Sequence, residues 1–460
     1  MSRPQRLRAL DAIFLPMETS TQSLHVGSVL ILEGRPPDPA AFRDHVVGAV
    51  ARVPVLGRRA MRMPLDLGRP VWVDAPEIDL AEHVHHARLD EPGGDEQLRD
   101  VVTEVMSRRL DADRPLWELW QVDGLAGGRW AVIAKAHHTM VDGQSGADLV
   151  AALLADAPTQ PQPVARRDPQ PVPTPVALVA DLLAWLVLLP LRAIRVLLRS
   201  VVDPGAARQR AARVRFGLRQ VLVPDLPPSP LTGPLGAERT WGWTSTELAP
   251  VAQVAHRAGA TVNDVFLAAL AGGLRRYLRG RVEAVDSIVV RAIVPVSPRT
   301  PQQPRRTGNL ASAMFVVLPT DLDEPAARLN AVKARTADQK ARGVPAATAA
   351  VVRIADHLPA VLLARGARAY GQSGQGRVNL VASNVRGPAQ EQRLLGSRLV
   401  ELVPWAPTAE EIRVSTAMVT CAGRMTIGIT TDAAALPDVD RLIDAVGREL
   451  TDLVSLEAPA

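Results

Sequence analysis

The sequence contains very little cysteine, lysine or aromatic side chain. One cysteine, Cys421, among 460 residues excludes an internal disulfide and a zinc site built from cysteine pairs. Because Cys421 lies in the apolar stretch 414–429, we expect a buried and unreactive thiol. Three lysines stand against fifty arginines, which indicates a coding bias, so the net charge of +5 is weak evidence for nucleic-acid binding. With only 3% aromatic residues and no basic block interleaved with them, we expect no nucleic-acid partner. We also expect no bound metal.

The sequence also lacks an apolar run long enough to cross a bilayer. Residues 182–191 are uncharged, but a spanning helix needs about 20 residues. The first residues reach Asp11 before a long apolar core forms, which excludes an ordinary secretory signal peptide. Residues 192–219 carry eight arginines and one acid, Asp203, a pattern compatible with an anionic membrane surface or with a core-packed helix whose arginines are solvated. We therefore expect a cytoplasmic protein, and contact with the inner face of the plasma membrane stays open.

One motif is typical of catalysis. His137 and His138 are followed, after three residues, by Asp142 and Gly143 in the run AHHTMVDG. The preceding residues 130–136 (WAVIAKA) are predicted to form a buried strand, which would hold His138 at the end of a rigid element. A neutral imidazole, with an unperturbed pKa of about 6.5, accepts a hydroxyl proton near pH 7. Gly143 permits a sharp turn and Asp142 can fix the loop, so His138 is a candidate general base, with a hydrogen-bonded core histidine as the alternative.

A second copy of the pattern serves as an internal comparison. His85 and His86 precede Asp90 at the same spacing, but Glu91 stands where the first copy has glycine. The residues before it, 79–84 (DLAEHV), are polar, so we interpret this copy as surface. The first copy differs by its apolar strand, by its glycine, and by a helix that we expect to begin at Ser145.

The chain is predicted to fold as two mixed α/β units, over residues 1–156 and 241–460. Between them, residues 157–240 hold a proline-rich linker followed by the apolar and basic segments. Strands are expected over 24–33, 116–122, 130–136, 287–295, 313–319, 378–382 and 424–430. Helices are expected over 265–278, 325–342, 345–370 and 437–455. A site between the two units would occupy a natural cleft.

Several further segments agree in order and spacing with one known family. They are residues 10–15 (LDAIFL), 114–118 (RPLWE), 262–265 (VNDV), 294–297 (VPVS), 308–309 (GN), 379–384 (NLVASN) and 387–388 (GP). With the histidine motif, they make the chain resemble, over nearly its whole length, the bacterial wax ester synthase/acyl-CoA:diacylglycerol acyltransferase family. The resemblance implies a two-domain α/β (α+β) fold, chloramphenicol acetyltransferase-like or condensation-domain-like, with an active-site tunnel between the domains. Arg386 departs from the family, whose members often carry proline there.

The resemblance also implies roles for individual residues. The second histidine carries the proton transfers in this superfamily, which implies His138 as the general base, with His137 in support. An oxyanion donor is expected from the second half of the chain, where Asn263, Ser383 and Asn384 are the candidates by motif match. The alternatives are structural: a helix cap for Asn263, and a strand end for Ser383 and Asn384.

The implied function is long-chain O-acyl transfer from acyl-CoA to diacylglycerol, giving triacylglycerol, or to a fatty alcohol, giving a wax ester. No cofactor is expected besides acyl-CoA as co-substrate. The surface of lipid droplets is a second expected place of contact, besides the inner face of the plasma membrane. Two alternatives stay open: a condensation-type acyltransferase acting on a carrier-bound or glycolipid acceptor, and a non-catalytic lipid-surface binding protein. The intact HHxxxDG run argues against the non-catalytic alternative.

Overall fold

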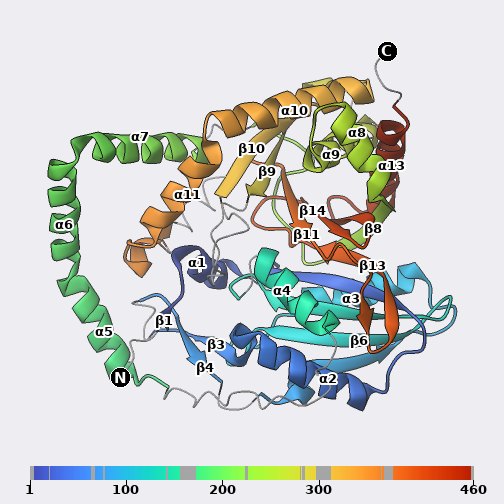
Figure 1. The fold of residues 1–460 in the computed structure, drawn as a ribbon, viewed down its shortest axis with the longest axis horizontal. Helices are drawn as coiled ribbons and strands as arrows, with labels where there is room; N and C mark the ends of the chain where they lie inside the picture. Colours follow the sequence, from blue (N-terminus) through green and yellow to red (C-terminus); the bar gives the residue numbers. More distant parts are fainter. Residues whose placement is uncertain are drawn as a thin grey trace.

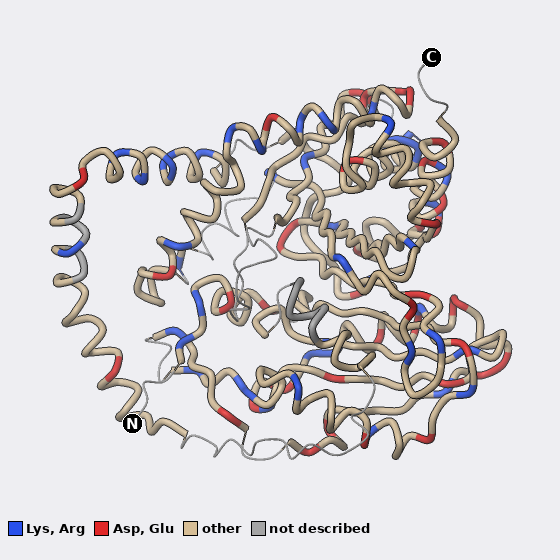
Figure 2. The backbone as a smooth tube through the Cα atoms, in the orientation of Figure 1, with Lys and Arg blue, Asp and Glu red and all other residues tan. Residues whose placement is uncertain are grey.

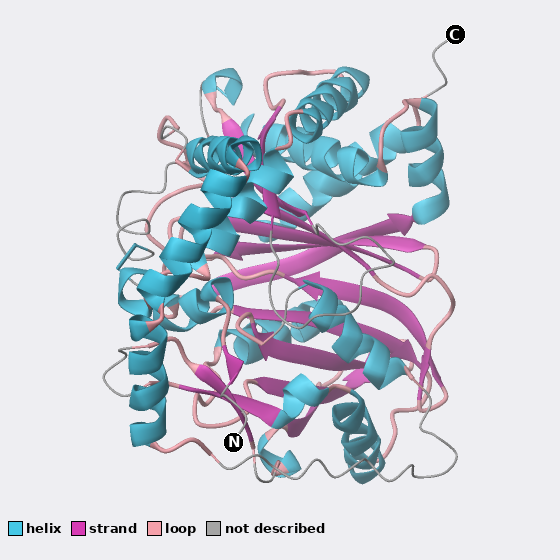
Figure 3. Ribbon diagram, turned by 60° about the vertical axis from the view of Figure 1, so that its left-hand side comes forward, coloured by secondary structure: helices cyan, strands magenta, loops and turns pink. Residues whose placement is uncertain are grey.

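Two six-stranded sheets form the body of the protein (Figure 1). The computed structural model describes residues 5–19, 21–63, 68–75, 78–140, 143–155, 172–222, 226–279, 281, 285–296, 312–363, 365–366 and 377–456. Within these ranges it gives no side-chain environment for residues 143–148, 192, 193, 196, 197 and 199. The strands run across the middle of the molecule, with helices above and below them (Figure 3).

The first sheet is built mainly from the first third of the chain. Its strand order is β12 (Arg393–Leu394), β13 (Ser397–Trp405), β2 (His25–Glu33), β7 (Arg129–His137), β6 (Trp117–Leu125) and β5 (Val84–Arg88). Helices α2 (Pro39–Arg52) and α4 (Gly143–Leu154) pack on one face, and α3 (Asp95–Ser107) packs on the other. Strand β7 is buried on both faces, because Val132 faces α2 and α4 while Ile133 faces α3. Burial on both faces explains why its sequence is a continuous apolar run.

Most of the expected elements of the first sheet are confirmed. Strands β2, β6 and β7 match the ranges 24–33, 116–122 and 130–136 to within a few residues, and β6 and β7 form a hairpin. The polar segment around His85 and His86 was not expected to be a strand, yet it forms the edge strand β5, parallel to β6. An edge strand tolerates polar residues because one side of it faces solvent. The surface interpretation is confirmed for His86, which is exposed and contacts Asp123.

The second sheet belongs to the second half of the chain. Its order is β10 (Ser312–Leu318), β9 (Val290–Val296), β11 (Leu380–Arg386), β14 (Val414–Cys421), β15 (Arg424–Asp432) and β8 (Arg239–Glu247). Helices α8 (Leu248–Arg257), α9 (Val262–Arg279), α10 (Pro325–Ala341) and α13 (Val439–Val454) form the largest core with one face of this sheet. The expected helix over 345–370 is wrong in its length, because α11 (Val344–Ala355) ends early and the next helical residues begin after Pro359. Proline lacks the N–H that would continue a helix.

One segment crosses between the two halves. Residues 393–405 fall within the range expected for the second unit, yet they form β12 and β13 of the first sheet. Strand β13 runs antiparallel to β2, from Arg398 opposite Glu33 to Trp405 opposite Gly27. The first sheet is therefore completed by residues that follow β11 of the second sheet.

The chain between the halves forms a three-helix frame, which we define as α5 (Pro175–Val187), α6 (Leu189–Val202) and α7 (Pro204–Val221). Figure 1 shows this frame along one side of the body, with α6 farthest from the sheets. Each end is anchored: Asp181 of α5 forms an ion pair with Arg6 at 2.6 Å, and Gly217 of α7 packs closely on Ala347 of α11. No helix in the described part of the chain is long and apolar enough to cross a membrane. The expected linker falls mostly in residues 156–171, outside the described residues.

A small third sheet supports the frame. Its strand order is β1 (Gln5–Arg6), β4 (Val71–Asp74) and β3 (Arg58–Met61), and α1 (Ala9–Met17) lies next to it (Figure 1). Leu178 of α5 packs into a small core with Met63, Val71 and Val73 beside this sheet. This contact fixes the start of the frame to the first half of the protein.

The two large sheets touch at a point where no side chain fits. A Cβ on Gly428 of β15 would lie 2.0 Å from the carbonyl oxygen of Pro404 in β13, and Trp241 Nε1 donates a hydrogen bond to the same oxygen at 3.3 Å. Only glycine at position 428 allows the two backbones to approach this closely.

We therefore expect Gly428→Ala to lower the free energy of unfolding by about 3 kcal/mol, because backbone must move to make room for the methyl group. The matched control is Gly48→Ala in the interior of α2, where the new Cβ meets only the flexible end of Arg52 at 3.5 Å. That control should be neutral or stabilising by up to about 1 kcal/mol. Urea denaturation midpoints test both expectations, and equal midpoints for the two variants would contradict the close approach.

Candidate active site at the end of strand β7

The catalytic motif sits where β7 ends. His137 is the last residue of β7 and lies opposite His25, the first residue of β2. The chain then turns: the Met140 N–H donates to the His137 carbonyl at 2.9 Å, and the His138 N–H donates to the Leu24 carbonyl at 2.9 Å. Thr139 Oγ1 also donates to the Asp11 carbonyl of α1 at 3.0 Å. The backbone around His138 is thus held from two sides, by α1 and by Leu24, the residue before β2.

The ring of His138 is oriented by packing. It stacks on Phe14 of α1, with ring centroids 4.2 Å apart and an interplanar angle of 22°. His138 is half-buried, unlike its neighbour His137. A proton-transferring group needs this combination of a fixed orientation and access to a ligand.

His137 is held as a neutral, buried support. Its side chain is 1% exposed, and its Nδ1 accepts a hydrogen bond from the Thr139 N–H at 3.1 Å. The proton of the neutral ring therefore resides on Nε2. Burial, with smaller contributions from His138 and Arg109, lowers the pKa of His137 to about 3. His137 consequently carries no charge near neutral pH, and it does not compete with His138 as a titrating base.

Two further polar residues at this place were not singled out from the sequence. Glu18 Oε1 lies 3.3 Å from His25 Nε2 and 3.9 Å from His137 Nε2, while its Oε2 accepts from Arg109 at 3.2 Å. Glu18 and His25 are more than a hundred residues from the motif, and a single glutamate or histidine carries no pattern. The signal that could have found His25 is the pairing of β2 with β7, because it places His25 opposite His137.

The candidate oxyanion residues come from two elements of the second half. Asn384 Nδ2 of β11 donates to Asn263 Oδ1, in the first turn of α9, at 3.2 Å. Ser383 is not brought to this pair, because successive strand residues point to opposite faces. The helix-cap alternative for Asn263 is wrong: Thr261 and Asp264 cap α9 through reciprocal hydrogen bonds of 2.8 and 3.2 Å. Likewise β11 runs through Ser383 and Asn384 to Arg386, so neither ends the strand.

Helix α4 connects the histidine motif to the second half. It begins at Gly143 and not at the expected Ser145, and it contacts β11, the strand of Asn384. Figure 1 shows α4 at the boundary between the two large sheets, below β11. Asp142 lies outside the described residues.

Cys421 is not part of the candidate active site. It is the last residue of β14 and is buried, and burial raises the pKa of its thiol to about 11. The thiol is therefore protonated at neutral pH, which confirms the expectation that it is buried and argues against a covalent acyl-cysteine.

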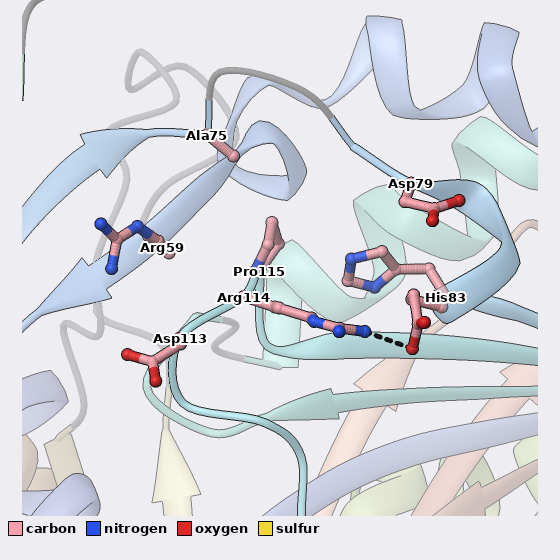
Figure 4. A pocket seen from close by; sticks show the side chains of 8 residues that line it. Arg59, Ala75, Asp79, His83, Asp113, Arg114 and Pro115 are labelled. Carbon is pink, nitrogen blue, oxygen red and sulfur yellow. Dashed lines mark ion pairs between the residues drawn. The ribbon is translucent and has the colours of Figure 1, made fainter.

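A cavity of about 510 Å³ lies at the same end of the first sheet, beside the start of β6 (Figure 4). Most of the side chains that line it are charged, namely Arg59, Asp79, Glu82, Asp113 and Arg114, and the others are His83, Ala75 and Pro115. Arg114 forms an ion pair with Glu82, marked in the figure. An acyl chain requires an apolar lining, so this cavity does not suit the lipid substrate.

Comparison with known proteins identifies the family. The wax ester synthase/diacylglycerol acyltransferase catalytic domain matches residues 7–266, and the C-terminal domain of the same family matches residues 307–454. The chain belongs to this family. It is therefore an acyltransferase, and the resemblance seen in the sequence is confirmed.

Relatives and solved structures agree with this assignment. A Mycobacterium tuberculosis protein (strain ATCC 25618 / H37Rv) named as a probable diacylglycerol O-acyltransferase, tgs1, is 32% identical over 468 residues, covering 98% of this chain and 96% of that protein. The wax ester synthase/diacylglycerol acyltransferase from Marinobacter aquaeolei VT8 has a similar structure, with a TM-score of 0.70, 22% identity and 98% of each chain covered. The first condensation domain of the calcium-dependent antibiotic synthetase has a TM-score of 0.60 and 16% identity, covering 100% of this chain and 98% of that one. The two-domain acyltransferase and condensation-domain fold is thus confirmed.

Substitutions of the neighbouring residues Asn263 and Asp264 should change the free energy of unfolding by clearly different amounts. Asp264 is buried and accepts hydrogen bonds from Thr261 and, at 2.7 Å, from Thr336 of α10. We expect Asp264→Ala to lower the free energy of unfolding by about 2–3 kcal/mol, because it leaves these donors unpaired. Asn263→Ala should cost less than about 1 kcal/mol, since its one side-chain bond is exposed. Thermal and urea unfolding measure both, and equal losses would contradict a structural role confined to Asp264.

Proposed function

We propose that this acyltransferase transfers long-chain acyl groups from acyl-CoA to diacylglycerol or to a long-chain alcohol, with His138 as the general base. The observation that carries the proposal is the orientation of His138, whose ring stacks on Phe14 while its backbone is bound to Leu24 at the end of β7. A rigidly held imidazole beside a neutral His137 suits a proton transfer near neutral pH.

The reaction follows from the chemistry of a thioester and an alcohol. His138 accepts the hydroxyl proton while the alcohol oxygen attacks the thioester carbonyl carbon, and a C–O bond forms. The carbonyl oxygen then carries negative charge in a tetrahedral intermediate. Collapse of this intermediate breaks the C–S bond, and the departing thiolate takes the proton from His138. Direct attack is preferred to an acyl-enzyme, because the only cysteine is buried and protonated.

The oxyanion requires hydrogen-bond donors, and the Asn263 and Asn384 pair is our candidate. Asn263 uses its oxygen to accept from Asn384, which directs its own Nδ2 donors away from that contact. Amide donors held in place by a neighbour stabilise developing charge without reorganisation during the reaction. The contact of α4 with β11 supports a shared site, since these elements follow the histidines and carry Asn384.

His138→Ala should lower kcat by about 10²- to 10⁴-fold with an unchanged melting temperature, because it removes the general base. The assay uses labelled palmitoyl-CoA with diacylglycerol, hexadecanol or glycerol, and the products are resolved as lipids. The panel also separates the acceptor classes, because a condensation-type enzyme would transfer to none of the three.

The matched control is His86→Ala in the second copy of the pattern. Its ring is exposed on the edge strand β5 and contacts Asp123, far along the chain from the motif. Turnover should stay within about twofold of the parent, as is usual for an exposed side chain. A similar loss in both variants would remove His138 from its assigned role.

We propose in addition that the frame binds peripherally to a lipid surface, at the inner face of the plasma membrane or on lipid droplets. The support is a set of exposed apolar side chains that recur at helical spacing along α5 and α6. They are Val176, Leu183, Leu186, Val187, Leu191, Ile194, Leu198, Val201 and Val202. Val202 is 85% exposed and Leu198 is 58% exposed. Exposed apolar residues gathered on one element are typical of an interaction surface.

The charges of the frame favour an anionic lipid surface over a protein partner. Helix α6 contains three arginines and no acid, and α7 adds further arginines. Figure 2 shows basic residues along α7 and only isolated acidic residues on the frame, which are Asp181 and Asp203. Each arginine near an anionic surface contributes about 1 kcal/mol to binding. Both substrate classes partition into lipid, so an enzyme located at that surface meets them directly.

Flotation with anionic liposomes tests the surface proposal. The triple variant Leu191→Ser, Leu198→Ser and Val202→Ser should bind at least about tenfold more weakly, because each buried apolar side chain contributes about 1 kcal/mol or more. Replacing Arg192, Arg195 and Arg199 with glutamine should weaken flotation mainly at low salt, where screening is least.

Val47→Ser provides the control, because Val47 is 50% exposed on α2, outside the frame. It should float like the parent, and all variants should retain activity on detergent-dispersed substrate. Unchanged flotation of both triple variants would show that the frame serves another purpose, and self-association in sedimentation would identify a second copy as the partner.

A further inference from the structure

Helix α1 begins without a cap from its own part of the chain. Arg8 occupies the N-cap position of α1, and among the described residues its side chain makes no capping hydrogen bond. The Ala9 N–H donates instead to Asp356 Oδ1 at 2.7 Å, across 347 positions of sequence. A helix of the first half is thus capped by a carboxylate of the second half. A carboxylate suits this place, because a helix N-terminus carries partial positive charge.

Asp356 is fixed to the second half by the helix that it follows. It comes directly after α11, and the buried Thr348 of that helix exchanges two hydrogen bonds with Ala313 of β10, both at 3.1 Å. From the first half, Arg69 donates to the Asp356 carbonyl at 2.7 Å and to the Leu7 carbonyl, just before α1, at 3.3 Å. The Arg69 guanidinium therefore holds Asp356 beside the start of α1.

The same short helix supports the candidate general base. Phe14 of α1 stacks on His138, and the Asp11 carbonyl of α1 accepts from Thr139 Oγ1. Helix α1 has nine residues, and Phe14 lies about one and a half turns beyond the capped first residue. A displacement of the first turn is therefore transmitted to Phe14 and to the turn that carries His138.

We propose that Asp356 is a positioning residue for His138, and that it acts through α1 across the boundary between the two halves. Its carboxylate fixes the start of α1, and α1 in turn fixes the ring and the backbone turn of the base. The position of His138 then depends on both halves, on one through β7 and on the other through Asp356. The alternative is that Asp356 only stabilises the fold, as an ordinary helix cap does.

Two substitutions at Asp356 remove different parts of the contact. Alanine removes the acceptor, whereas asparagine keeps an oxygen that accepts from the Ala9 N–H and loses only the charge. The bond from Arg69 to the Asp356 carbonyl involves the backbone, so both variants retain that acceptor. We expect Asp356→Ala to lower kcat about tenfold, since a displacement of about 1 Å at a catalytic group costs up to about 100-fold. KM for palmitoyl-CoA should stay within about twofold, and Asp356→Asn should restore kcat to within about threefold of the parent.

Asp38→Ala is the matched control, because Asp38 is also a helix cap. Its Oδ1 accepts from the Ala40 N–H at 2.8 Å in the first turn of α2, at an exposed position. Both alanine variants should melt a few degrees below the parent, since each loses one capping hydrogen bond. Only Asp356→Ala should lose kcat, and Asp356→Ser, whose hydroxyl is too short to reach Ala9, should behave like it.

Three kinetic outcomes overturn the proposal. The first is a parental kcat in Asp356→Ala and Asp356→Ser. The second is an equal loss of kcat in Asp38→Ala, which would make the effect one of general stability. The third is a kcat of Asp356→Asn as low as that of Asp356→Ala, which would remove the hydrogen bond to Ala9 from the explanation.

The inference rests on the proposed acyl transfer, so one measurement is chosen that does not depend on turnover. The ring centroids of His138 and Phe14 are 4.2 Å apart, so the ring current of Phe14 should shift the His138 ring protons in ¹³C–¹H spectra of histidine-labelled protein. His138→Ala identifies these signals by their loss. Asp356→Ala should move them toward the positions of an unstacked histidine, whereas Asp38→Ala should leave them in place.

The spectra and the assay together separate the two proposals. If the His138 signals move in Asp356→Ala while the parent acylates no acceptor, then the proposed function fails and the positioning role stands. If the parent is active and the signals stay in place in Asp356→Ala, then the positioning role fails and the proposed function stands.

Discussion

The pairing of β13 with β2 is the constraint on which the rest of the structure depends. Strand β2 carries His25 at its start and lies between β13 and β7, so β13 determines how β2 presents His25 to His137. Strand β13 also follows β11, which carries Asn384. A short length of chain therefore links the asparagine of one half to the sheet that holds the histidines of the other. The relative position of the two halves is set by a ladder of backbone hydrogen bonds, which is stiffer than a loop contact.

The carboxyl end of helix α3 binds buried polar side chains near the same site. Its last carbonyl groups have no partner within the helix, and they accept from side chains of the neighbouring strands. Lys135 Nζ donates to the Val105 and Arg108 carbonyls at 2.8 and 2.5 Å, and His25 donates to Met106. Burial lowers the pKa of Lys135 to about 8 despite the opposing effect of Glu118. The end of α3 thus holds two buried basic side chains, Lys135 and His25, and Glu18 is the acidic side chain beside His25.

Local patterns in the sequence predicted the local parts of this structure. The apolar runs of β2, β6 and β7, the helix that follows the histidines and the buried Cys421 could be read from periodicity, because burial of a strand or helix face leaves a repeating pattern. The edge strand β5 could not, since its polar residues resemble a loop. The crossing of β13 and the meeting of Glu18 with His25 depend on pairings distant in sequence, which one sequence does not encode as a local pattern. Asn263 was found by its motif, but its contact with Asn384 in place of a helix cap became visible only in three dimensions.

The frame of α5 to α7 is tied at one end to the small sheet of the first half and at the other end to α11 of the second half. The two halves are nevertheless also joined through β13, and through Asp356, which accepts hydrogen bonds from Ala9 and Arg69. A single protease cut within the frame would therefore leave two polypeptides that remain associated as one folded particle. Conversely, the first half produced as a separate fragment would expose the unpaired edge of β2, an open template for aggregation.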